Sequence, residues 1–220
     1  NASDLSTTDN RIEAVQKVLN EKYNNQERIS VYVKQLDTDR VAAINDEKSM
    51  YAASVAKLGV LYYAQERLSQ KKLSLSDEYQ YTAAVNGFPG AYDPDGSGKI
   101  SKIPDDKNYS LENLLKAVAQ NSDNVATNIL GYYVTNQYDK AFQKSVDKAA
   151  ATSWNMDKKE LTARAAGTLM EAVYRQNGDI INYLSSTDYD GERISKNIDV
   201  PVAHKIGDAY DFKHDVAIVY

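Results

Sequence analysis

Ser54 and Lys57 stand three residues apart at the start of a segment, Ser54–Leu68, whose apolar pattern predicts a helix. Residues at this spacing share one helix face, so the lysine amine lies near the serine hydroxyl. An uncharged amine can take the proton of that hydroxyl and make it a nucleophile. Burial can supply the uncharged form by lowering a lysine pKa from its ordinary value of about 10.4. The pair indicates acyl transfer through a serine ester, against the alternative of a helix-capping serine followed by a surface lysine.

Two later segments carry further polar groups. Ser122-Asp123-Asn124 offers a hydroxyl and an amide in a short break between two predicted helices. Lys205-Ile206-Gly207 places a cation and a glycine near the edge of a predicted strand. Singly, the first is typical of a capping turn and the second of an ordinary strand-edge charge. Their joint occurrence after Ser54 and Lys57 is much less expected by chance.

Together the three segments resemble the Ser-x-x-Lys, Ser-Asp-Asn and Lys-Thr-Gly motifs of class A β-lactamases and penicillin-binding proteins. Their order agrees, and the likeness extends from Arg11 to Tyr220. The resemblance implies a catalytic set and a substrate-binding set. The catalytic set is the nucleophile Ser54, its activating base Lys57, and Ser122 as proton donor to the leaving nitrogen. The substrate-binding set is Asn124, Lys205, Gly207 and Asp208. In this resemblance the backbone N–H groups of Asp208 and Ser54 form the oxyanion hole.

Ile206 is a first departure from the family pattern, which usually has threonine or serine at this position. The resemblance implies that this hydroxyl helps to bind the substrate carboxylate. A lost hydrogen bond to a charged group costs roughly 1.5–3 kcal/mol. We therefore expect weaker or altered substrate recognition, with the nucleophile retained.

The second departure is a missing glutamate. Class A β-lactamases carry a Glu-x-x-Leu-Asn loop whose glutamate activates the water that clears the acyl-enzyme, and residues 149–159 hold no such motif. The nearest carboxylates, Asp147, Asp157 and Glu160, lack the right neighbours. We predict a serine hydrolase that is acylated by β-lactams or D-alanyl cell-wall peptides and deacylates slowly. The alternative is a non-catalytic module that binds muropeptides or a protein on the same fold.

Asp93–Ile100 resembles the first eight positions of an EF-hand calcium loop. Pro104 stands where such a loop needs a bidentate glutamate, so the segment is interpreted as a turn-rich loop at the rim of the site. We expect no metal and no cofactor. Tyr92 or Tyr109 could flank the cleft. His204 neighbours Lys205 on one strand and so faces the opposite side.

The predicted elements place strands near both ends of the chain and helices between them. A helix is expected over residues 10–23, a β-hairpin over 29–44 and a mostly irregular loop over 86–108, and a second hairpin pairs 202–207 with 216–220. Further helices are expected over 110–118, 138–150 and 161–174, and one following Ser122-Asp123-Asn124. This arrangement predicts an α+β fold whose terminal strands form an antiparallel sheet against the helical middle.

The chain is expected to form one unit, with an α/β part from residues 1–50 and 175–220 and an all-α part from 51–174. The chain ends within the last expected strand, so the family's further strand and C-terminal helix are expected to be absent. That leaves an unpaired strand edge at Val216–Tyr220, which is prone to association.

Composition limits the partners. The 220 residues carry a net charge of −5, which gives no electrostatic reason to bind nucleic acid. No apolar stretch approaches the ~20 residues of a membrane span. Cysteine is absent, which excludes disulfides and thiol nucleophiles. The resemblance implies a bacterial protein that is extracellular or in the cell envelope, acting on a small β-lactam or a peptidoglycan peptide.

Overall fold

The computed structural model describes residues 2–220, with side chains from Asn10 onwards. Helix α2 (Lys57–Ser69) lies at the centre of the helical middle and contacts the other helices of that region. It is buried because it is apolar on most sides: Leu58, Val60 and Leu61 are all 0% exposed. The helices around it are α3 (Leu111–Asn121), α4 (Asn124–Tyr133), α5 (Lys140–Ala150), α6 (Ala163–Gln176) and α7 (Asp179–Leu184).

The strands form antiparallel pairs. The two long hairpins are β1 (Val31–Gln35) with β2 (Arg40–Ile44) and β7 (Val202–Ala209) with β8 (Phe212–Val219). Two shorter pairs are β3 (Met50–Tyr51) with β6 (Glu160–Leu161) and β4 (Glu78–Gln80) with β5 (Asn108–Ser110). Three short 3₁₀ helices complete the chain: η1 (Ala53–Ala56), η2 (Ala83–Asn86) and η3 (Arg193–Asn197). Among the described residues, each strand forms backbone ladder hydrogen bonds with a single partner strand.

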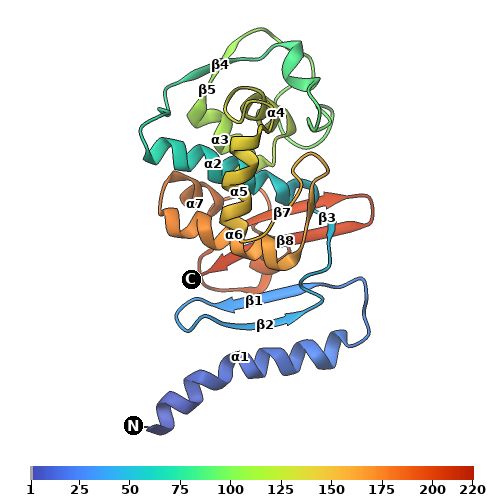
Figure 1. Cartoon of the computed structure of the whole chain (residues 1–220), viewed down its shortest axis with the longest axis vertical. Coiled ribbons are helices and arrows are strands. Elements are labelled where there is room, and N and C mark those ends of the chain that lie inside the picture. Colours follow the sequence, from blue (N-terminus) through green and yellow to red (C-terminus); the bar gives the residue numbers. More distant parts are fainter. Residues whose placement is uncertain (1) are drawn as a thin grey trace.

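Helix α6 joins the two ends of the chain, because it packs against both β1 and β8. Gly167 permits the contact with β1: a side-chain carbon there would lie 2.5 Å from the Tyr32 ring. Helix α1 (Ala2–Tyr23) covers β2 and shares a small separate core with it, built on Ile12, Leu19 and Ala42. Figure 1 shows α1 and the β1–β2 hairpin at one end of the molecule, with β7 and β8 at the level of α6. The predicted α+β class with a helical middle is confirmed, whereas the terminal strands form two separate hairpins, β1–β2 and β7–β8, in place of one shared sheet.

The predicted element ends agree with the structure at some positions and differ at others. The Ser110 side chain caps α3 by accepting from the Asn113 N–H, as predicted. Helix α1 begins at Ala2, well before the predicted start at Asn10. The second hairpin is longer than predicted, because only Tyr210 and Asp211 form its turn. Within the described part of the chain, no helix is long and apolar enough to cross a membrane.

Candidate active site

Ser54 lies in a tight turn between β3 and α2. Ala53, just before it, has a φ of 49°, a left-handed conformation that costs an alanine about 1 kcal/mol or more. The turn is closed by a hydrogen bond from the Val55 N–H to the Ala52 carbonyl. Ser54 is half-buried, and among the residues whose side chains are described no hydrogen bond engages its hydroxyl. The hydroxyl is therefore free to meet a substrate.

Lys57 opens helix α2 and is 0% exposed. Its Nζ lies 2.7 Å from the Ser122 carbonyl oxygen, 2.5 Å from Asn124 Oδ1 and 3.2 Å from Ser122 Oγ. Burial and the nearby charge of Lys205 hold the Lys57 pKa well below its ordinary value. An uncharged amine donates two protons, which the carbonyl and the amide oxygen accept, and keeps a lone pair free. The lowered pKa suits Lys57 to act as a base. Its hydrogen bonds run to Ser122 and Asn124, and not to Ser54.

Ser122, Asp123 and Asn124 fill the break between α3 and α4. Ser122 ends α3 with a φ of 51°. Asp123 caps α4 by accepting from the Ala126 N–H, which is the capping role that these residue types favour. Asn124 donates to the Asp93 carbonyl and turns its oxygen toward Lys57. The capping turn and the lysine-orienting site are therefore the same structure.

The loop over residues 93–100 packs beneath this break. A side-chain carbon at Gly96 would lie 2.2 Å from Asn124 Nδ2, and one at Gly98 would lie 2.4 Å from Asp123. The Asp123 carboxylate also accepts from the N–H groups of Lys99 and Ile100. The two glycines of the EF-hand-like segment thus allow close packing against the site. Among the described residues, no three His, Cys, Asp or Glu side chains gather as a metal-binding group.

Lys205 reaches the same hydroxyl from strand β7. It is 2% exposed, and its Nζ donates to Ser122 Oγ across 2.8 Å and to the Ile206 carbonyl across 2.9 Å. Burial lowers the Lys205 pKa to about 7, against the opposing charge of Asp215. Ser122 Oγ, whose two lone pairs can accept two hydrogen bonds, also accepts from Lys57 Nζ across 3.2 Å. The arrangement links two buried lysines through one serine.

Gly207 brings β7 against the serine turn. A side-chain carbon at this position would lie 2.6 Å from the Ala52 oxygen and 2.9 Å from the Val55 nitrogen. Asp208, the next residue, is exposed and ion-pairs with Arg193 across 2.6 Å. Ile206 is 6% exposed. The predicted site residues therefore lie on the serine turn, at the first residue of α2, in the break between α3 and α4, and on strand β7.

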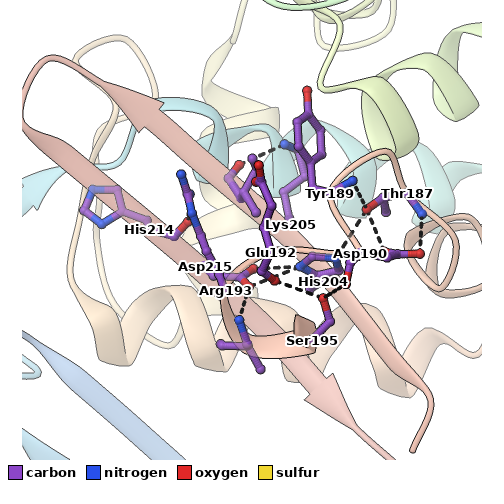
Figure 2. Close-up of polar contacts among 12 residues, drawn as sticks. Thr187, Tyr189, Asp190, Glu192, Arg193, Ser195, His204, Lys205, His214 and Asp215 are labelled. Carbon is purple, nitrogen blue, oxygen red and sulfur yellow. Dashed lines mark hydrogen bonds and ion pairs between the residues drawn. The ribbon is translucent and has the colours of Figure 1, made fainter. Parts of the chain in front are cut away.

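His204 lies on the other face of β7, as strand alternation predicts. It is 1% exposed, and Figure 2 shows its ring between Asp215 of β8 and Asp190 of the preceding loop. The ring nitrogens lie 3.1 Å from the Asp215 carboxylate and 2.9 Å from that of Asp190. Arg193, from the same loop, donates to the Gly207 and His214 carbonyls. This cluster fastens the loop before β7 to the strand that carries Lys205.

Sequence reasoning missed Lys159. This side chain is 7% exposed and its Nζ lies 4.5 Å from the centre of the Tyr92 ring, while Lys57 Nζ lies 4.6 Å from the same centre. The structure thus selects Tyr92 over Tyr109 as the tyrosine at the site. The segment Asp93–Ile100 carries a recognisable pattern of glycine and acidic residues, and no motif of this kind surrounds Lys159.

The three carboxylates nearest the expected glutamate loop play other parts. Asp147, on helix α5, accepts hydrogen bonds from the Gln143 side chain and from the Trp154 backbone N–H. Asp157 and Glu160 are exposed, and Glu160 belongs to β6. In the segment over residues 149–159, the buried charged side chain beside the site is that of Lys159.

A model of the beta-lactamase enzyme family, Beta-lactamase2, matches residues 10–220. The chain belongs to this family. No curated protein matches it. The recognition made from the three motifs is therefore confirmed at the level of the family.

Solved structures of β-lactamases and penicillin-binding proteins share the fold. A β-lactamase from Chitinophaga pinensis DSM 2588 is 18% identical with a TM-score of 0.71, covering 93% of this chain and 84% of its own. The ancestral class A β-lactamase GNCA has the same identity and TM-score, with coverages of 93% and 85%. A point mutant of PBP-A, solved as an acyl-enzyme complex with penicillin G, is 14% identical with a TM-score of 0.70 and coverages of 94% and 86%. At these identities the likeness establishes the fold.

Within the β-lactamase family, this chain combines familiar and unusual positions. Ser54, Lys57 and Ser122 stand at positions that match the motifs. Ile206 and the loop that ends at Lys159 depart from the class A pattern.

Proposed function

We propose that this protein is a serine acyl-transfer hydrolase in which Ser54 forms a covalent ester with β-lactams or with D-alanyl cell-wall peptides. The observation that carries the proposal is the environment of Lys57. Its amine is 0% exposed, and its three hydrogen-bond contacts are all to uncharged groups. Such an environment favours the uncharged amine, which is the form able to accept a proton from a serine.

The proposed acylation proceeds in three proton transfers. The Ser54 oxygen attacks the carbonyl carbon and its proton passes to Lys57. As the C–N bond breaks, Ser122 gives its proton to the leaving nitrogen. Lys57 then returns a proton to Ser122 across their 3.2 Å contact, which leaves the amine uncharged again. The products are a serine ester and an amine, with no net change in the protonation of the protein.

The substrate class rests on Lys205 and on the relatives. A cation on strand β7 attracts the carboxylate that penicillins and D-alanyl-D-alanine peptides carry near the reactive amide. The PBP-A mutant described as an acyl-enzyme complex with penicillin G supports this class. The gap that Gly207 leaves beside the serine turn lets the Ser54 and Asp208 backbones approach one another as an oxyanion hole.

Turnover is proposed to be slow. Hydrolysis of the ester needs a base that activates water, and among the described residues Asp147, Asp157 and Glu160 form no hydrogen bond with Lys57, Ser122 or Lys205. Lys159 is a donor at the Gly90 carbonyl and does not replace a carboxylate. The protein would act outside the cytoplasmic membrane, in the cell envelope or beyond it, because cell-wall peptides occur there.

Intact-mass measurement over time after addition of penicillin G tests the proposal. We expect a stoichiometric adduct that persists for many minutes and is absent from Ser54→Ala. Ser49→Ala is the matched control, because Ser49 is an exposed serine in the same region. Unchanged labelling of Ser54→Ala would refute the assignment of the nucleophile.

The same measurement separates the two functions weighed from the sequence. A non-catalytic binding module would give saturable binding of a muropeptide that Ser54→Ala leaves unchanged, with no adduct from any of several β-lactams or activated esters. Rapid disappearance of the adduct would contradict slow deacylation and indicate an efficient β-lactamase.

A further inference from the structure

Lys159 is fixed beside the serine turn by its own backbone. Its carbonyl accepts from the Ala52 N–H across 2.7 Å, two residues before Ser54. Its φ of 54° turns the chain sharply before β6, which pairs with β3. The side chain therefore starts from a backbone position that is tied to the nucleophile.

The Lys159 amine is also held in place. Its Nζ donates to the Gly90 carbonyl across 2.6 Å and lies 3.5 Å from the Asp157 carbonyl. Gly90 has a φ of 92°, and a side-chain carbon there would lie 3.1 Å from Asp157 Oδ1 and from the Tyr138 ring. Among the described residues, no carboxylate forms an ion pair with Lys159. Within this described part of the chain the Lys159 amine therefore has no ion-pair partner, and the carboxylate that acts on its charge from a greater distance is that of Asp157.

Tyr92 connects this amine to the catalytic lysine. Its hydroxyl donates to the Ala53 carbonyl across 3.0 Å, and its backbone N–H and carbonyl both bond the Asn128 amide. Burial holds the Tyr92 pKa well above its ordinary value, so the hydroxyl remains a donor. The ring is thus fixed at both ends, with Lys57 Nζ 4.6 Å and Lys159 Nζ 4.5 Å from its centre.

We propose that Lys159 is a positioning residue for acylation, whose ammonium group beside the shared Tyr92 ring favours the uncharged form of the Lys57 amine. The proposal deepens the acylation mechanism above and rests on it for its purpose. Two positive charges near one buried ring repel each other, so one of the two amines loses its proton more readily. Lys159 thus acts through the protonation of Lys57 and not through contact with the substrate.

The surroundings decide which amine yields its proton. Among the residues whose side chains are described, the charges of Lys205 on β7 and of Lys159 before β6 lower the Lys57 pKa, and the charge of Asp123, before α4, raises it. Lys159 is slightly more exposed and has Asp157 near it, whose charge raises the Lys159 pKa against the effect of burial. The proton therefore stays on Lys159 and leaves Lys57.

The test is a direct titration of Lys57 by ¹H–¹³C NMR in protein labelled with ¹³C-lysine, assigned with Lys57→Met. In Lys159→Met we expect the Lys57 pKa to rise by about one pH unit. Lys159→Arg keeps the charge and should keep the wild-type titration. Lys158→Met is the matched control, because Lys158 is exposed. If Lys159→Met does not fold, Lys159→Gln removes the charge and retains an N–H donor.

An unchanged Lys57 titration in the neutral variants would overturn the proposal. The titration needs no acylation, so it separates this inference from the proposed function. If acylation by penicillin occurs, the acid limb of its pH profile should move upward in Lys159→Met by the same amount and stay in place in Lys158→Met. If no variant is acylated, the proposed function fails, whatever the titration gives.

Discussion

Lys205 donates a hydrogen bond to the Ser122 hydroxyl across 2.8 Å, although 83 positions separate the two residues in the chain. Lys57 lies 3.2 Å from the same oxygen. The hydroxyl thus joins strand β7 to helix α2 at the point where each contributes a buried amine. This contact makes Ser122 the centre of the proposed proton transfers.

Replacement of Ser122 by alanine should slow acylation while Ser54 remains present. Proton transfer by a positioned group contributes about 10²–10⁴-fold, and we expect a loss of this size in the second-order acylation rate. Stopped-flow measurement with a chromogenic cephalosporin gives that rate. Ser101→Ala, at an exposed loop position, should leave it unchanged. An undiminished rate in Ser122→Ala would exclude Ser122 as the proton donor.

Lys205 should make the stability of the protein depend on pH. Its folded pKa is about 7, below the ordinary 10.5. Between these pH values the unfolded chain binds more protons than the folded one, so the free energy of unfolding rises with pH, by at most ~1.4 kcal/mol per pH unit. Lys205→Met should reduce this slope in denaturant titrations from pH 7 to 9.5. The exposed Lys213→Met should retain the wild-type slope, and equal slopes in all three proteins would contradict the shifted pKa.

The motif positions could be predicted because they combine chemistry with local structure. Ser110, Asp123 and the break at Ser122 carry capping signals that act within a few residues, and the structure follows them. The helix that begins at Lys57 is apolar on most sides, which indicated its burial. Such signals depend on nearest neighbours along the chain, so sequence alone reveals them.

Lys159 could not be predicted in the same way, and the sequence named Tyr92 only as an alternative to Tyr109. Their contact depends on a tertiary approach of the loop before β6 to the loop before Asp93, and neither residue has a periodic or capping pattern. The roles of Gly96 and Gly98 were also hidden, because a calcium-like spacing and a close-packing requirement select the same residue type. Short pairs such as β4 with β5 were missed because three residues are too few for strand alternation to emerge.

His204 should stabilise the protein at acidic pH. Burial lowers its pKa, but the hydrogen bonds and charges of Asp215 and Asp190 outweigh burial and raise the pKa above 6.5. This stabilisation is therefore complete below pH 6.5 and is lost as the pH rises through the folded-state pKa. Relative to the wild type, His204→Gln should lose more stability at pH 5.5 than at pH 8.5, as measured by thermal unfolding.

The second histidine supplies the control. His214 contacts the Tyr51 carbonyl, and among the described residues it forms no ion pair with a carboxylate. His214→Gln should therefore leave the acid-side stabilisation in place. A loss of stability in His204→Gln that is the same at both pH values would indicate a packing role without a charge interaction.

Gly207→Ala tests whether the close approach of β7 to the serine turn is required. The added carbon would meet the Ala52 oxygen at 2.6 Å and the Val55 nitrogen at 2.9 Å, and both are backbone atoms that cannot rotate away. Strand β7 must therefore shift, which misplaces Lys205 relative to Ser54. A misplacement near 1 Å can cost about 10²-fold in rate, and we expect acylation to slow by this amount or more. Gly191→Ala is the matched control because no atom lies within 4 Å of its added carbon. A Gly207→Ala protein that melts and acylates like Gly191→Ala would show that the turn and the strand can separate without loss of function.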